Sequence, residues 1–301
     1  MTKIEVTFLG TGTTIPTKER NHSAIHLKYI GEKEYNLLFD CGEGTQRQMT
    51  FANLNFMAID YVFITHWHAD HCIGIFGLIN SMNLEDRKKP LIIFAPQAEK
   101  FGKMVLDFYK PKFEVRFVSS RSRGIKKILE EEEFQVFTYP VRHTLPTQAY
   151  AFVEKDRIKL DKEKLRKFRI YGRLCRILKE KGEVEKGGRR IKLEEVSRVI
   201  KGKKVVYSGD TEFFEEFREF AENSDLLIHD CTYFKREDVK EKMHSCVEDV
   251  LKFKDICKKL VLTHIGRKYT SKKELERILK SLGEKGDKVI IAEDFLKISL
   301  E

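Results

Sequence analysis

Short apolar runs rich in β-branched and aromatic residues recur along the chain, and most of them end in a few polar or glycine residues. Runs of this length and composition predict buried strands, and longer segments with apolar residues at helical spacing predict helices. The predicted strands are 3–9, 23–29, 35–40, 59–64, 91–95, 113–118, 134–138, 148–153, 204–207, 225–229, 260–263, 288–291 and 295–299. The predicted helices are 72–83, 97–109, 213–221, 245–258 (with Ser245 as its cap) and 271–282, with a short helical stretch between 118 and 134. The pattern indicates an α/β fold.

The composition limits the class of protein. The chain has 301 residues, of which 41% are hydrophobic and 35% charged, so one large domain or two small ones are expected. No apolar run approaches the roughly 20 residues that span a bilayer, and the first eight residues alternate like a strand rather than a signal peptide. We therefore expect a cytoplasmic protein that does not enter a membrane. The six cysteines include no C-x-x-C pair, which argues against a disulfide framework and a thiolate zinc site.

The positive charge of the chain is concentrated in one segment. The formal net charge is +10, and residues 155–204 alone hold 20 Lys or Arg against 8 Asp or Glu, which gives 20 − 8 = +12. Interleaved aromatic and aliphatic residues give this segment a small apolar surface. It resembles a basic insert that follows a phosphate backbone, which favours a nucleic-acid partner. The alternative is a solvated lysine-rich loop.

The most informative motif is Thr65-His66-Trp67-His68-Ala69-Asp70-His71, which directly follows the predicted strand 59–64. Imidazole and carboxylate groups are the nitrogen and oxygen ligands that zinc prefers, and this density of them is rare outside metal sites. The alternative is a polar loop that happens to contain histidine. The motif therefore predicts a metal site on a strand-to-helix turn.

Further candidates follow other predicted strands. His143, Asp210 and His264 each come at the end of a strand, so they can meet the first motif at one edge of a sheet. Asp40 also follows a strand, and we expect it to orient a ligand histidine rather than bind metal. The ligand candidates are His66, His68, Asp70, His71, His143, Asp210 and His264. Seven ligands are too many for one tetrahedral zinc and suit two ions that share a carboxylate; the lack of cysteine indicates a catalytic centre.

At this point the sequence resembles a known family. The His-x-His-x-Asp-His motif with the three later ligands is similar to the metallo-β-lactamase superfamily, and more closely to its tRNA 3′-end endonucleases, the RNase Z family. The stretches that carry the resemblance are Phe8-Leu9-Gly10-Thr11-Gly12, Phe39-Asp40-Cys41-Gly42-Glu43-Gly44-Thr45-Gln46-Arg47-Gln48, the opening motif, Ser208-Gly209-Asp210-Thr211 and Thr263-His264-Ile265. They extend over nearly the whole chain.

The resemblance implies a four-layer αββα sandwich in one domain, 1–301, with residues 155–204 as an inserted tRNA-binding arm. It implies two Zn²⁺ per chain, although the same ligands accept Mn²⁺ or Fe²⁺. Its ligand assignment puts one ion on His66, His68 and His143 and a second on Asp70, His71 and His264, with Asp210 bridging. Asp70 would also accept a proton from the attacking water, and a homodimer is implied.

The resemblance also implies a catalytic pair in the second half of the chain. His244, which precedes a serine, would protonate the leaving oxygen, and Asp230 would be its partner where the family usually has glutamate. The predicted function is removal of the 3′ trailer from precursor tRNA, leaving a 3′-hydroxyl on the tRNA and a 5′-phosphate on the trailer. Two alternatives stay open: a small-molecule phosphodiesterase or other hydrolase of the superfamily, and a non-catalytic RNA-binding protein with a structural metal.

Overall fold

The computed structural model describes residues 2–108, 110–239, 243–284 and 286–301. The chain forms two compact units by its internal contacts. The larger unit consists of Met1–Val153 and Lys204–Glu301, and we call it the body. The smaller unit, Glu154–Lys203, covers almost the same residues as the basic segment, and we call it the basic unit.

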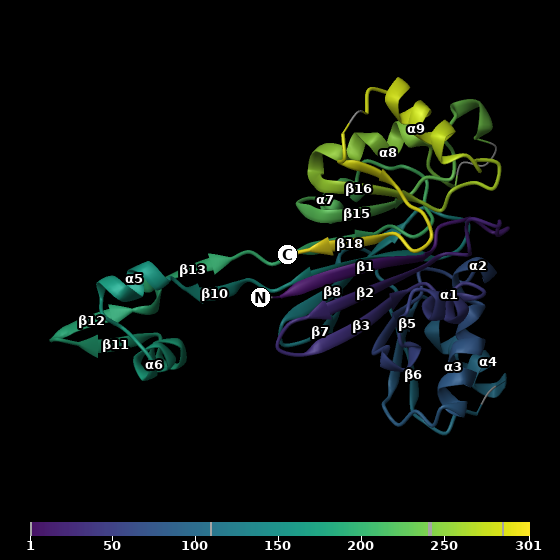
Figure 1. Cartoon of the computed structure of the whole chain (residues 1–301). Coiled ribbons are helices and arrows are strands. Elements are labelled where there is room, and N and C mark those ends of the chain that lie inside the picture. The colour runs from purple at the N-terminus through teal and green to yellow at the C-terminus, as the bar shows by residue number, and fades with distance from the viewer. Residues whose placement is uncertain (1, 109, 240–242, 285) are drawn as a thin grey trace. The chain divides into compact units, whose positions relative to one another are not determined.

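The body contains two mixed sheets of seven strands each (Figure 1). The first sheet contains β1 (Lys3–Gly10), β2 (Ala24–Ile30), β3 (Glu34–Phe39), β4 (Tyr61–Phe63), β5 (Leu91–Ala95), β6 (Val115–Ser119) and β18 (Lys297–Leu300). Its strand order is β18-β1-β2-β3-β4-β5-β6. The second contains β7 (Lys126–Glu130), β8 (Phe134–Val141), β9 (Thr147–Glu154), β14 (Lys204–Tyr207), β15 (Ser224–Asp230), β16 (Cys257–Thr263) and β17 (Val289–Ile291). Its order is β17-β16-β15-β14-β9-β8-β7.

Helices cover the outer face of each sheet, which gives the four layers that the resemblance implied (Figure 1). The first sheet carries α1 (Thr45–Phe51), α2 (Ala69–Cys72), α3 (Gly74–Leu84), α4 (Ala98–Phe108) and the 3₁₀ turn η1 (Phe56–Ala58). The second carries α7 (Phe217–Ala221), η3 (Arg236–Asp238), α8 (Val247–Val250), η4 (Leu251–Ile256) and α9 (Lys272–Ser281). A core of aromatic and branched side chains such as Phe8, Phe63 and Tyr150 fills the space between the sheets.

The strand directions explain where a site can form. Strands β3 to β6 run parallel to one another, and so do β14 to β17. The carboxyl ends of parallel strands meet at one edge of a sheet, so loops after different strands come together there. The apolar character of these strands follows from burial on both faces, since each sheet is covered by helices on one side and by the other sheet on the other.

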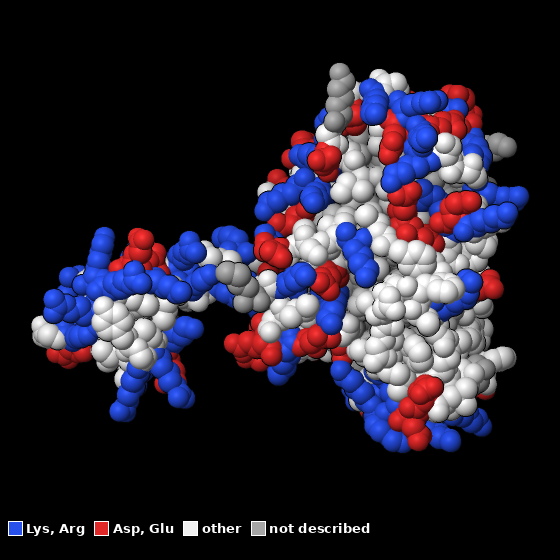
Figure 2. All heavy atoms as spheres, in the orientation of Figure 1, with Lys and Arg blue, Asp and Glu red and all other residues white. Residues whose placement is uncertain are grey.

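The basic unit has its own small core. It contains β10 (Arg157–Leu160), α5 (Lys162–Lys167), α6 (Arg173–Lys181), β11 (Glu183–Lys186), β12 (Arg189–Lys192), η2 (Leu193–Val196) and β13 (Ser197–Ile200). Strand β10 pairs antiparallel with β13, and β11 with β12. Buried residues including Leu178 and Ile191 form the core, and Lys and Arg side chains dominate the visible surface of the unit (Figure 2). The unit is inserted between two neighbouring antiparallel strands, since Val153 of β9 lies opposite Lys204 of β14.

Three expectations from the sequence are wrong. The stretch expected to be helical before β8 contains strand β7, which pairs antiparallel with β8. The helix expected from 213 begins only at Phe217. Ser245 does not cap a helix, because its Oγ donates to the Thr211 carbonyl and helix α8 begins at Val247.

None of the helices in the described ranges combines the length and the apolar character that a membrane span requires.

Candidate metal centre

The loops after the parallel strands bring the predicted ligands together. Asp40 follows β3 and His66 follows β4 in the first sheet, while Asp210 and His264 follow β14 and β16 in the second. Asp40 and His264 both have a φ of 57°, a left-handed backbone that costs non-glycine residues of order 1 kcal/mol or more. This cost at two predicted site residues shows that the surrounding contacts impose their positions.

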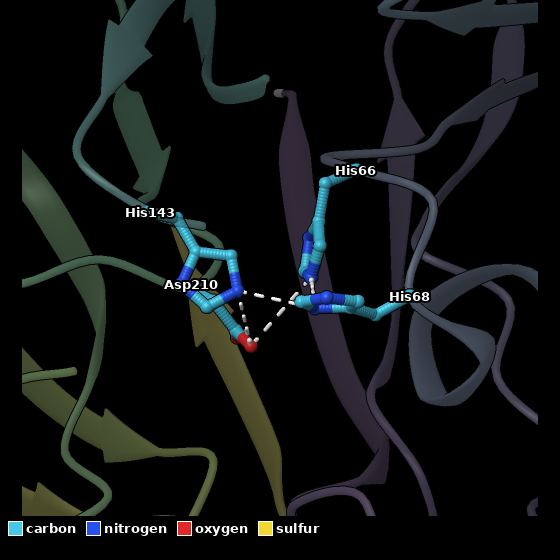
Figure 3. Close-up of side chains that lie close together, drawn as sticks. All are labelled: His66, His68, His143 and Asp210. Atoms are coloured by element: carbon cyan, nitrogen blue, oxygen red, sulfur yellow. Dashed lines mark hydrogen bonds and ion pairs between the residues drawn. The ribbon is translucent and has the colours of Figure 1, made fainter. Parts of the chain in front are cut away.

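The first group consists of His66, His68, His143 and Asp210, which point toward one another from three loops, with His66 and His68 in the same loop after β4 (Figure 3). His68 Nδ1 lies 2.9 Å from His66 Nε2 and 3.1 Å from His143 Nε2. Asp210 Oδ2 lies 3.7 Å from His66 Nε2 and 3.9 Å from His143 Nε2. Ring nitrogens this close to one another are arranged as ligands of a common cation.

The second group consists of Asp70, His71, Asp210 and His264, all of them buried. His71 Nε2 lies 3.2 Å from Asp210 Oδ1, and His264 Nε2 lies 3.3 Å from Asp210 Oδ2. Asp70 Oδ2 lies 3.6 Å from His71 Nε2 and 3.5 Å from His264 Nε2. Asp210 belongs to both groups, so the structure brings all seven predicted ligands into two sets with one carboxylate in common.

Hydrogen bonds on the far side of the rings determine which nitrogen faces the centre. His71 Nδ1 lies 2.7 Å from Asp40 Oδ2, and His143 Nδ1 lies 3.0 Å from the Met243 carbonyl. A carboxylate and a carbonyl accept but cannot donate, so both Nδ1 atoms carry a proton, and the Nε2 atoms are the ones left to bind a cation in place of a proton. The position of Asp40 behind His71 agrees with the orienting role expected from the sequence.

Two threonines fix the other rings in the same way. Thr65 Oγ1 donates to Asp40 and lies 3.0 Å from His66 Nδ1. Thr232 Oγ1 donates to Asp230 Oδ1 at 2.8 Å and lies 3.0 Å from His264 Nδ1. A hydroxyl has one hydrogen, so each threonine must accept from the histidine and leave Nε2 with its lone pair.

These supporting residues were not found from the sequence. Tyr207 is a further example, because its hydroxyl donates to Asp40 Oδ2 at 2.8 Å from inside the core. Thr65 begins the quoted motif and Thr232 lies two residues after Asp230, so their positions were a signal, but their hydrogen-bond partners depend on how the chain folds. Tyr207 ends a strand and looks like an ordinary core residue.

The charges around the centre fit divalent cations. Four carboxylates, Asp40, Asp70, Asp210 and Asp230, are at most 3% exposed, and buried charge of one sign is costly unless cations compensate it. Asp210 Oδ1 is buried and forms no hydrogen bond with any described residue. Burial also lowers the pKa of His66, of His68 and of His143, which keeps these rings neutral and able to bind a metal.

His244 and Asp230 form a pair beside the two groups. His244 Nδ1 lies 2.8 Å from Asp230 Oδ2, and the His244 ring stacks on His264 with 5.2 Å between centroids. Asp230 also accepts hydrogen bonds from the backbone amides of Thr211 and Thr232, which hold its carboxylate in position. The shorter aspartate therefore contacts the histidine at a position where the family usually has glutamate. Burial lowers the pKa of His244, but the Asp230 carboxylate outweighs it and raises the pKa to about 9.

Asp210, Asp230, His244 and His264 also lie close enough for a shared cation. His244 Nδ1 is already engaged by Asp230, and a cavity of about 180 Å³ opens beside the His244 ring. This access suits a histidine that exchanges a proton with a substrate better than one that closes a metal site.

Comparisons with known proteins agree with this geometry. Residues 4–105, less than half of the chain, match the family model "Anti-Pycsar protein Apyc1". Over 300 residues the chain is 40% identical to ribonuclease Z of Thermococcus kodakarensis, with 97% of this chain and 93% of that protein covered. The crystal structure of human tRNase Z, short form, matches with a TM-score of 0.67 and 25% identity over 98% of both chains. The metallo-β-lactamase fold protein YhfI of Bacillus subtilis matches with a TM-score of 0.69, 19% identity, and coverage of 99% of this chain and 100% of that one, which bears on the fold alone.

The sequence match extends through every strand-end loop that supplies the centre, and the same architecture is found in solved structures. The chain belongs to the ribonuclease Z family, the metal-dependent endoribonucleases of the metallo-β-lactamase fold.

Proposed function

We propose that this chain removes the 3′ trailer from precursor tRNA by hydrolysing one phosphodiester bond at the candidate metal centre. The products are a tRNA with a 3′-hydroxyl and a trailer with a 5′-phosphate. The observation that carries the proposal is the membership in the ribonuclease Z family over 97% of the chain, with two complete ligand sets and the His244–Asp230 pair in place.

The residues fit two divalent ions, and we propose zinc. His66, His68 and His143 would hold one ion, Asp70, His71 and His264 would hold the other, and Asp210 belongs to both groups. When bound, such ions lower the pKa of a water molecule and neutralise charge on the phosphoryl group. Nitrogen and carboxylate ligands suit zinc, and the same set accepts Mn²⁺ or Fe²⁺, so quantification of metals in protein purified from its native host tests the identity.

The chain's own residues supply the proton transfers. His244 protonates the 3′ oxygen that leaves, because its Nδ1 is held by Asp230, no hydrogen bond of its Nε2 is found among the described residues, and a cavity opens beside the ring. Asp230 keeps the ring oriented and protonated. Asp70, a member of the second group, would accept the proton that the attacking water loses.

The basic unit binds the tRNA part of the precursor, away from the cleavage site. Its surface is rich in Lys and Arg, and some of these side chains, such as the exposed Arg173, form no ion pair with an acid among the described residues. Replacement of 154–203 by a two-residue Asn-Gly turn between Val153 and Lys204 tests this, since these residues face each other across adjacent strands. The shortened protein should lose precursor cleavage and retain activity on a small chromogenic phosphodiester.

Cleavage of an end-labelled precursor tRNA with analysis of both new ends tests the reaction itself. A 2′,3′-cyclic phosphate on the tRNA would exclude the proposed mechanism, because water would then not be the nucleophile. Equal loss of both activities after removal of the basic unit would favour a small-molecule hydrolase. A homodimer and a cytoplasmic location stay predictions, and light scattering tests the first.

A further inference from the structure

The loop between β6 and β7 lies at the same edge of the body as the metal centre. Ser120 at its start donates its amide to the Ala95 carbonyl, and its Oγ forms a hydrogen bond of 2.8 Å with the Tyr150 hydroxyl. That hydroxyl also donates to the Ile64 carbonyl at 2.7 Å, directly before the metal-binding motif. The loop is therefore fastened to the strand that presents the ligands.

A second set of bonds fixes the middle of this loop. Ser122 Oγ donates to the side-chain oxygen Oε1 of Gln148 at 2.8 Å, and the backbone amide of Gln148 donates to the Thr65 carbonyl at 3.0 Å. Ser122 is thus two hydrogen bonds away from the residue that precedes His66. Thr138 Oγ1 also donates to Gln148 Oε1, at 3.0 Å, which holds the Gln148 side chain in place.

Two arginines flank this fixed serine. Arg121 and Arg123 are both exposed, and neither forms an ion pair or a side-chain hydrogen bond within the described part of the chain. Other arginines of the body do: Arg142 pairs with Glu216, and Arg218 with Asp255. Two unneutralised guanidinium groups on an anchored loop beside a phosphodiesterase centre are suited to bind phosphate groups.

The position of the loop relative to His244 indicates which phosphates. The partner of His244, Asp230, ends strand β15, while the partner of Ser122, Gln148, lies in strand β9. Strand β14, which leads to Asp210, lies between β15 and β9. His244 protonates the oxygen that stays with the tRNA, so the tRNA side of the scissile bond lies toward His244. The RNA on the other side of the scissile phosphate is the trailer.

We propose that Arg121 and Arg123 bind the backbone phosphates of the 3′ trailer, immediately downstream of the scissile bond. This inference rests on the proposed function. It makes trailer length a determinant of efficiency: a trailer of several nucleotides reaches the two arginines, and a single-nucleotide trailer, whose only phosphate is the scissile one, does not.

The test compares two precursors with the same tRNA and trailers of one and of about ten nucleotides. The variant R121Q/R123Q should lower kcat/KM for the long trailer roughly tenfold, and should reduce the slope of log kcat/KM against log salt by about 1.4, because two single-strand phosphate contacts are lost. Cleavage of the one-nucleotide trailer should stay at the wild-type rate.

The matched control is R277Q/K280Q, which removes two exposed cations without side-chain partners in the described residues from α9. It should change neither rate. Three results would overturn the inference, provided that the wild-type protein cleaves both precursors. They are an equal loss of kcat/KM on both precursors, no loss on either, and the same loss in the control variant. Failure of the wild-type protein to cleave either precursor would overturn the proposed function and this inference with it.

Discussion

Replacement of His244 tests the assignment of the proton donor most directly. His244→Ala removes a ring whose side chain is 16% exposed and which lies outside both ligand sets that share Asp210. The two ion-binding groups keep all seven of their members. The variant should therefore bind metal normally and lose only the protonation of the leaving oxygen.

The size of the loss follows from the geometry. A positioned general acid contributes about 10²–10⁴ in rate, or roughly 3–5.5 kcal/mol of barrier. We place His244 in the middle of this range, because the 2.8 Å contact with Asp230 fixes the ring, and the Asp230 carboxylate raises its pKa whereas bound cations lower it. We expect kcat to fall by about 10³ on an ordinary precursor.

A substrate with a bridging 3′ sulfur at the cleavage site separates this role from others. A thiolate leaves without a proton, so the variant should cleave the sulfur substrate at nearly the wild-type rate. Metal content measured on the same samples is the control. An equal loss on the oxygen and sulfur substrates would refute the assignment of His244 as the acid, and loss of metal would make it a ligand instead.

Asp230→Asn extends the same reasoning to pH. The acid must be protonated to act, so activity declines as pH rises through the pKa of His244. The Asp230 carboxylate raises that pKa, and its neutral replacement should shift the alkaline limb of the kcat profile to lower pH. Bound cations lower the pKa of His244 in the wild type and in the variant alike. The measurement is therefore the difference between the alkaline limbs of their two kcat profiles. A profile that moves to higher pH, or does not move, would contradict the pairing.

Three further outcomes are expected. Asp40→Asn should weaken metal affinity by about 10–100-fold in competition with a fluorescent chelator, because His71 loses a charged partner; unchanged affinity would remove Asp40 from this role. Gly209→Ala should lower the free energy of unfolding by about 1–3 kcal/mol in urea denaturation, because φ is 60° there and a Cβ would approach Thr65 to 2.8 Å; a neutral effect would show that the loop adjusts. Chelation of the ions should lower the melting temperature and abolish cleavage, both reversibly, because the buried carboxylates lose their compensating charge; a constant melting temperature would mean that they are compensated otherwise.

The sequence predicted which side chains would come together, because the signal was local. Each apolar run marks where a strand ends, and parallel strands end at one edge, so Asp210 and His264 could be placed without knowing the whole fold. Trp67, which stands between His66 and His68 in the motif, does not belong to either ligand group; its ring stacks on Phe101 with 4.3 Å between centroids.

The failures have a different origin. Strand β7 reads Lys-Lys-Ile-Leu-Glu, residues that favour helices in isolation, and only its pairing with β8 makes it a strand. Ser245 looks like a helix cap, but the Thr211 carbonyl from a distant loop takes its hydroxyl. The support of the ligands by Tyr207 depends likewise on contacts between segments far apart in sequence, which no local pattern encodes.

The junction of the basic unit has a consequence for how such an enzyme can change. The unit leaves the body after Val153 and returns at Lys204, two residues that already face each other across paired strands. The insertion is thus, topologically, an enlarged hairpin loop, and lengthening such a loop adds little closure entropy. If the basic unit recognises the substrate, as proposed, recognition can change by replacement or remodelling of this one insert, while the register of the strands that lead to Asp210 stays the same. Selection for a new RNA partner and selection for hydrolytic chemistry can therefore proceed almost independently within one polypeptide.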